Sequence, residues 1–102
     1  PSIEKFLFEI IVSKKNKELR KEINDKYFQL TSLDAICAEF NAEYPDVKAH
    51  KDKIFYRYLI KDLANRKITE DVFVESLCDD ILEKIDVSKF VRSFADILGC
   101  HL

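Results

Sequence analysis

Glycine and proline are scarce in this sequence, which has one glycine and two prolines among 102 residues. Architectures rich in β-turns use both residues repeatedly, because glycine adopts positive φ and proline presets φ at the first corner of a turn. Their scarcity favours an all-α protein. A chain of this length fits one domain. We therefore expect residues 1–102 to form a compact single-domain bundle of five or six short helices, with no sheet.

Other absences narrow the class of protein. No apolar run approaches the ~18 residues of a membrane span. The apolar stretch near the N-terminus lacks a basic flank and is interrupted by Glu4 and Glu9, so no signal peptide is expected. The three cysteines, Cys37, Cys78 and Cys100, cannot all pair within one chain, which predicts reduced thiols and a cytoplasmic location. The net charge of −2 argues against general binding of polyanions.

Motifs that carry catalysis or bind metals and nucleotides are also missing from the sequence. His50 and His101 are the only histidines, and neither has a nucleophile or carboxylate at a diagnostic spacing. Cys100 adjoins His101, but nothing nearby completes a tetrahedral metal site. The metal-binding, nucleophile and phosphate-loop signatures do not occur. The sequence therefore predicts a non-enzymatic protein with no cofactor and no metal.

Apolar residues recur at helical spacing in six segments. The segments lie over residues 3–14, from about 19 to 27, from Thr31 to Pro45, from Lys51 to Ala64, from Thr69 to about Ile85, and from Asp86 or Ser88 to Gly99. The second segment has only a narrow apolar stripe, which predicts a helix at the surface. Thr31 and Asp34 have the spacing of a capping box, so the Thr31 side chain is expected to cap the third helix. Thr69 is expected to cap the fifth helix.

Acidic residues recur every four positions in the fifth segment. We call them the acidic row: Asp71, Glu75, Asp79 and Glu83, with Asp80 and Asp86 at its edges. On a helix this spacing places the row along one flank. Like charges at that spacing destabilise a helix by roughly 0.2–0.5 kcal/mol per pair, so the row needs either an internal cationic neighbour or an external basic partner.

An internal neighbour is available in the fourth segment. Lys53, Arg57 and Lys61, which we call the cationic row, repeat at the same spacing. A short connection would make the fourth and fifth helices antiparallel neighbours, and the two rows could then face each other. Alternatively the acidic row stays open and docks on another protein. The sequence leaves both explanations open.

Three functions fit these patterns. The most concrete is a small cytoplasmic inhibitor, similar in kind to an immunity protein or antitoxin, that binds a basic partner through the acidic row. A second is a scaffold or adaptor domain of a larger protein that holds a peptide or helix in an apolar groove. Phe8 and Val12, which lie outside the main apolar face of the first helix, would contact that partner or a second copy of the chain. A third is nucleic-acid binding through the cationic row and the basic stretch Lys14–Lys21.

Overall fold

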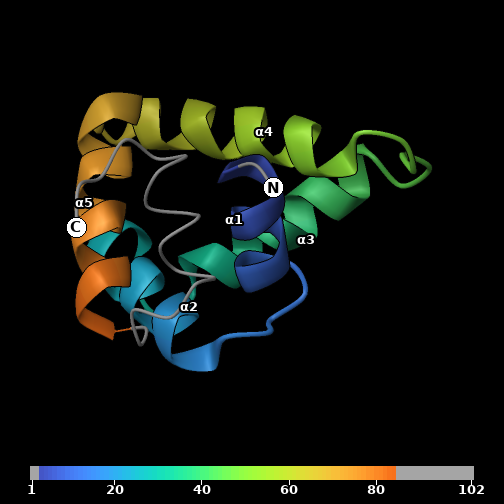
Figure 1. Cartoon of the computed structure of the whole chain (residues 1–102). Coiled ribbons are helices and arrows are strands. Elements are labelled where there is room, and N and C mark those ends of the chain that lie inside the picture. Colours follow the sequence, from blue (N-terminus) through green and yellow to red (C-terminus); the bar gives the residue numbers. More distant parts are fainter. Residues whose placement is uncertain (1–2, 85–102) are drawn as a thin grey trace.

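The computed structural model describes residues 3–84, and within that range it contains five α-helices, one π-helical turn and no strand (Figure 1). The elements are α1 (Ile3–Ile11), α2 (Lys17–Ile23), η1 (Asn24–Phe28), α3 (Ser32–Glu43), α4 (Lys51–Asn65) and α5 (Glu70–Lys84). The prediction of an all-α bundle is confirmed for this part of the chain. The sixth predicted segment, including Asp86, lies outside the described residues.

Helix α1 forms its most extensive contacts with α4, against which it lies, and it also contacts α2. Figure 1 shows α4 along one edge of the bundle and α5 leaving its end in a different direction. Helix α5 closes the bundle by packing on α2 as well as on α4. Helix α1 stops at Ile11, earlier than the sequence predicts, and the chain then turns where Lys14 adopts a left-handed conformation with φ 56°.

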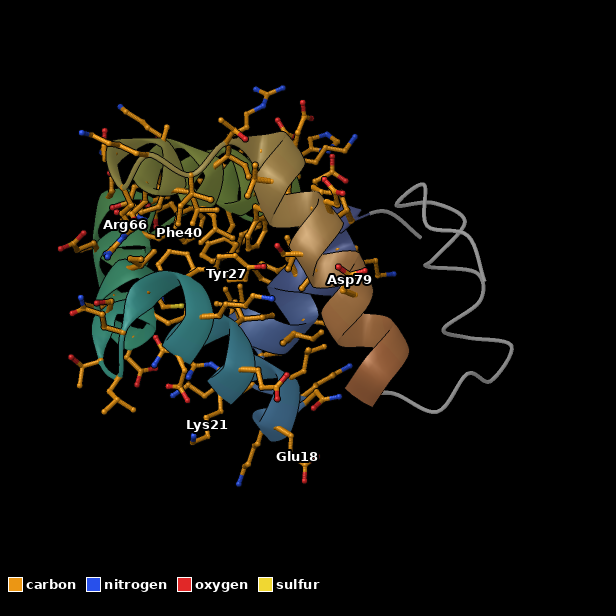
Figure 2. The ribbon with its side chains drawn as sticks, turned by 90° about the vertical axis from the view of Figure 1, so that its left-hand side faces the viewer. Glu18, Lys21, Tyr27, Phe40, Arg66 and Asp79 are labelled. Atoms are coloured by element: carbon orange, nitrogen blue, oxygen red, sulfur yellow. The ribbon has the colours of Figure 1, made fainter. Side chains whose placement is uncertain are left out.

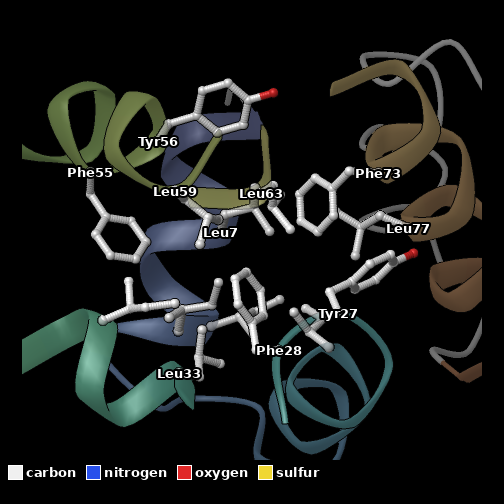
Figure 3. Close-up of a cluster of buried hydrophobic side chains, with 14 of the residues drawn as sticks. Leu7, Tyr27, Phe28, Leu33, Phe55, Tyr56, Leu59, Leu63, Phe73 and Leu77 are labelled. Carbon is white, nitrogen blue, oxygen red and sulfur yellow. The ribbon is translucent and has the colours of Figure 1, made fainter. Parts of the chain in front are cut away.

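Buried side chains from every element form one core (Figure 3). Four phenylalanines are among its largest fully buried members: Phe28, Phe40, Phe55 and Phe73. Burying a side chain of this size stabilises the fold by about 1.5–3 kcal/mol. The rings of Tyr27 and Phe73 meet edge to face at 4.9 Å between centroids, which joins η1 to α5.

Helix α2 lies at the surface, as the sequence predicts, with its narrow apolar stripe turned toward the core. Leu19 and Ile23 are at most 1% exposed, whereas Lys17, Glu18 and Lys21 are exposed. The Asn16 side chain caps α2 by accepting a hydrogen bond from the Leu19 N–H at 3.0 Å. Beyond Ile23 the helix widens into the π-helical turn, closed by a 2.7 Å bond from the Gln29 N–H to the Asn24 carbonyl. The wider turn lets Tyr27 and Phe28 both face the core.

The capping box predicted for α3 does not form. The Thr31 side chain makes no capping bond. Instead the buried Asn24 side chain accepts a bond from the Leu33 N–H at 3.2 Å. Asp34 is engaged elsewhere, because it pairs with Arg20 from α2. Asn24, which is distant in sequence, therefore caps α3 in place of the local residue Thr31.

At the start of α5 the prediction from sequence is confirmed. The Thr69 hydroxyl accepts a bond from the Val72 N–H at 3.2 Å. Within residues 3–84, no helix combines the length and the hydropathy that a membrane span requires.

Candidate protein-docking site

Helices α4 and α5 meet at a corner, and the prediction that they are antiparallel neighbours was wrong (Figure 1). The turn between them is closed by a 2.9 Å bond from the Ile68 N–H to the Leu63 carbonyl, and Lys67 adopts a left-handed conformation with φ 63°. The Tyr56 hydroxyl joins the two helices at the corner, because it donates a 2.7 Å bond to Glu70. The contact between α4 and α5 therefore uses other residues than the two charged rows.

The described members of the acidic row face solvent. Asp71, Glu75 and Asp79 are all exposed, and Figure 2 labels Asp79 on α5. Among the side chains that the structure describes, no ion pair joins these three carboxylates to a cation. Internal pairing with the cationic row therefore does not explain them.

Not all of the predicted acidic site is described. Asp80 and Glu83 lie on α5, but their side chains are outside the description, and Asp86 lies beyond it. Val72 is the one feature of this flank that the charge pattern did not single out. It is 53% exposed and, by helical spacing, lies among the acids. The flank therefore offers an apolar contact as well as negative charge.

The cationic row is likewise open to solvent. Lys53, Arg57 and Lys61 are exposed, and none of them forms an ion pair with another residue in the described part of the chain. Two of them help to line a groove of about 390 Å³ between the end of α3 and α4. The groove is lined by Glu43, Tyr44, Ile54, Arg57, Tyr58 and Lys61.

Aromatic packing fixes the floor of this groove. The buried Phe40 ring lies 5.3 Å from the Tyr44 ring and 5.6 Å from the Tyr58 ring, centroid to centroid. The Tyr58 hydroxyl donates to a Glu39 carboxylate oxygen at 3.4 Å. Burial, followed by the nearby Glu39 charge, raises the pKa of Tyr58 above its ordinary value of 10.0. Tyr58 is adjacent to Arg57 of the cationic row in the sequence. No sequence pattern predicts that Tyr44 lines the same groove.

The basic stretch Lys14–Lys21 is partly neutralised within the fold. Lys14 and Arg20 both pair with Asp34, and Lys21 pairs with Asp25 at 2.8 Å. Asp25 is also the first cause of the raised pKa of Lys21. These internal partners reduce the positive surface that nucleic-acid binding would need.

Phe8 and Val12 are half-buried and pack against the core. The Phe8 ring meets Phe55 edge to face at 6.2 Å, and the Lys51 ammonium lies 6.0 Å from its centroid. These contacts explain why apolar residues occupy the second side of α1. Their use as partner contacts stays a prediction.

Among the side chains that the structure describes, other reactive groups do not assemble into a site, and no group of three or more potential metal ligands occurs. Cys37 is half-buried, and burial raises the pKa of its thiol, which lowers the thiolate fraction. The Cys78 side chain, Cys100 and His101 are outside the described part.

Comparison with protein families, characterised proteins and solved structures found no match. The function is therefore inferred from the surface itself.

Proposed function

We propose that this protein is a non-enzymatic cytoplasmic module that inhibits a basic partner protein by docking the acidic row of α5 on it. One observation carries the proposal. Asp71, Glu75 and Asp79 are exposed along one flank and have no ion-pair partner among the described residues.

The cost of this arrangement supports a role in binding. Like charges one turn apart destabilise α5 by roughly 0.2–0.5 kcal/mol per pair, and no described cation offsets that cost. A basic partner would remove the repulsion and would be attracted before contact, so association would be fast and salt-sensitive. The exposed Val72 supplies apolar area inside the charged flank. Shape and charge together fit a protein surface better than a small ion.

Partner capture at two salt concentrations tests the proposal. The full chain is immobilised and exposed to extract at ~50 mM and ~300 mM salt. The higher salt concentration shortens the Debye length and so screens the exposed charges. A captured basic protein is then purified, and its association rate is measured directly. We expect binding at low salt and its loss at high salt.

A pair of matched variants separates the acidic row from general charge. Glu75→Gln with Asp79→Asn removes two charges from the row, whereas Glu18→Gln with Asp46→Asn removes two exposed charges elsewhere. The first variant should slow association by about tenfold or more and flatten its salt dependence. The second should change the rate by less than about twofold. Equal rates for the two variants would contradict the proposal.

A further inference from the structure

Helices α4 and α5 carry the same surface pattern with the charges inverted. Each pattern has a charge at positions one, five and nine and an apolar residue at position two. The α4 pattern is Lys53, Ile54, Arg57 and Lys61, and the α5 pattern is Asp71, Val72, Glu75 and Asp79. Both helices are described over these positions, so the two patterns form equivalent stripes on two helices.

Both stripes are available for contact. All six charged side chains are exposed, and no ion pair among the described side chains joins one row to the other. Val72 is 53% exposed on α5, while Ile54 lines the groove beside Tyr58 on α4. The corner between α4 and α5 therefore leaves each row without the complementary row of its own molecule.

We propose that the groove-side face of α4 binds the acidic row of α5 from a second copy of this chain. In each helix the apolar residue is displaced from the charged row in the same rotational sense. Antiparallel docking then sets the cationic row opposite the acidic row and places the apolar residues of both helices on the same side of it. The expected partners are Lys53 with Asp79, Arg57 with Glu75, and Lys61 with Asp71.

The groove favours a second copy over a nucleic acid. Glu43 lies at the groove and Glu39 holds the Tyr58 hydroxyl, so a continuous polyanion would meet negative charge beside the cations. A helix with one carboxylate per turn, in contrast, presents its charges at the same spacing as the three cations of α4. This inference goes beyond the proposed function, because α4 takes no part there. Self-association and the foreign partner would compete for the acidic row.

The predicted association is weak and dependent on salt. Exposed ion pairs contribute only about 0.2–1 kcal/mol each, so the binding must come from several pairs acting together with the apolar area of Ile54 and Val72 at the two ends of the contact. Sedimentation equilibrium of the full chain at ~50 mM and ~300 mM salt measures it. We expect an average mass above the 12.0 kDa of the monomer at low salt and a shift to the monomer at high salt.

Charge reversal of each row makes the test specific. One variant carries Lys53→Glu, Arg57→Glu and Lys61→Glu, and the other carries Asp71→Lys, Glu75→Lys and Asp79→Lys. Each variant alone has two rows of the same sign and should remain monomeric. Their equimolar mixture restores opposite rows and should associate as the wild type does. A control with Lys15→Glu, Lys17→Glu and Lys48→Glu changes the same charge at exposed sites elsewhere and should still associate.

A mixture that stays monomeric, with both variants helical by circular dichroism, would overturn the inference. So would a monomeric wild type at low salt that binds a single-stranded oligonucleotide through the cationic row. The variant reversed on α4 retains the acidic row, so its binding to the captured basic protein tests the proposed function separately. Failed self-association with intact partner binding would remove only the second-copy proposal.

Discussion

The side chain of Asn24 caps the helix that begins eight residues later, at Ser32. Its Oδ1 atom accepts the Leu33 N–H at 3.2 Å, and Asn24 itself is only 7% exposed. The π-helical turn therefore holds the start of α3, and the two elements are joined by a buried polar contact as well as by apolar packing. Burial makes the bond valuable, because a lost partner would leave the Leu33 N–H unpaired away from water.

Replacing Asn24 tests this relationship. Asn24→Ala should lower the free energy of unfolding by about 1–3 kcal/mol, since it removes a buried acceptor. Thr31→Ala should cost less than about 0.5 kcal/mol, because the Thr31 side chain makes no capping bond. Urea denaturation followed by circular dichroism measures both. Equal losses for the two variants would contradict the assignment of the cap to Asn24.

Arg20 ties together the ends of three helices. Its Nε donates to the Ile11 carbonyl at 3.0 Å and its guanidinium pairs with Asp34, while only 14% of its side chain is exposed. Arg20→Lys keeps the charge but loses the planar guanidinium that makes both contacts. The free energy of unfolding should therefore fall by about 1–3 kcal/mol. Lys21→Met breaks the exposed pair with Asp25 and should cost less than about 0.5 kcal/mol. Chemical denaturation would show the difference.

Tyr56 should make the fold sensitive to high pH. Burial, together with the bond to Glu70, raises the pKa of Tyr56 above the ordinary 10.0. The unfolded chain releases this proton near pH ~10 while the folded chain keeps it, so Tyr56 stabilises the fold below that pH. Above it, stability should fall by about 1.4 kcal/mol per pH unit for this group until the folded pKa is reached.

Tyr56→Phe isolates that effect. The variant should lose about 0.5–1.5 kcal/mol at neutral pH with the hydrogen bond, but its stability should decline less steeply above pH ~10. Urea denaturation across the alkaline range gives both slopes. Parallel slopes for wild type and variant would show that Tyr56 titrates alike in the folded and unfolded chain.

Phe40 is expected to be the most costly core position near the groove. It is fully buried and its ring contacts Tyr44, Phe55 and Tyr58. Phe40→Ala should destabilise the fold by about 3–5 kcal/mol, because it leaves a cavity under the two groove tyrosines. Phe40→Leu should cost less. A thermal melt that moves little for the alanine variant would argue against the packing described here.

The sequence predicted the helix bounds well where the apolar stripe was broad or where the capping residue directly precedes the helix. The segments that became α3 and α4 were placed to within a few residues, and Thr69 caps α5 as its sequence position suggests. For α2 the narrow stripe predicted a helix at the surface, but it did not indicate how deeply Leu19 and Ile23 would be buried. No local sequence pattern predicts the π-helical turn. Its extra residue is stabilised by the burial of Tyr27 and Phe28 in the core, which depends on the rest of the fold.

The sequence predicted that the acids of the acidic row share one helix flank, but it did not predict what surrounds that flank. Helical spacing alone places Asp71, Glu75 and Asp79 on one flank. Which surface faces them depends on the direction of α5, and that direction is set by the turn at Lys67, where a residue other than glycine takes φ 63°. The short connection favoured an antiparallel hairpin, with an open acidic row as the alternative. In the structure, packing of Phe73 against Tyr27 holds α5 on η1.

The corner between α4 and α5 has an electrical consequence. A net charge of −2 exerts little long-range pull on a partner. Yet the described members of the two rows, three positive and three negative exposed charges, lie on separate helices, a separation of charge that the net charge does not reveal. Such a molecule turns in the field of a charged surface before contact, so a basic partner would orient the acidic row as well as attract it.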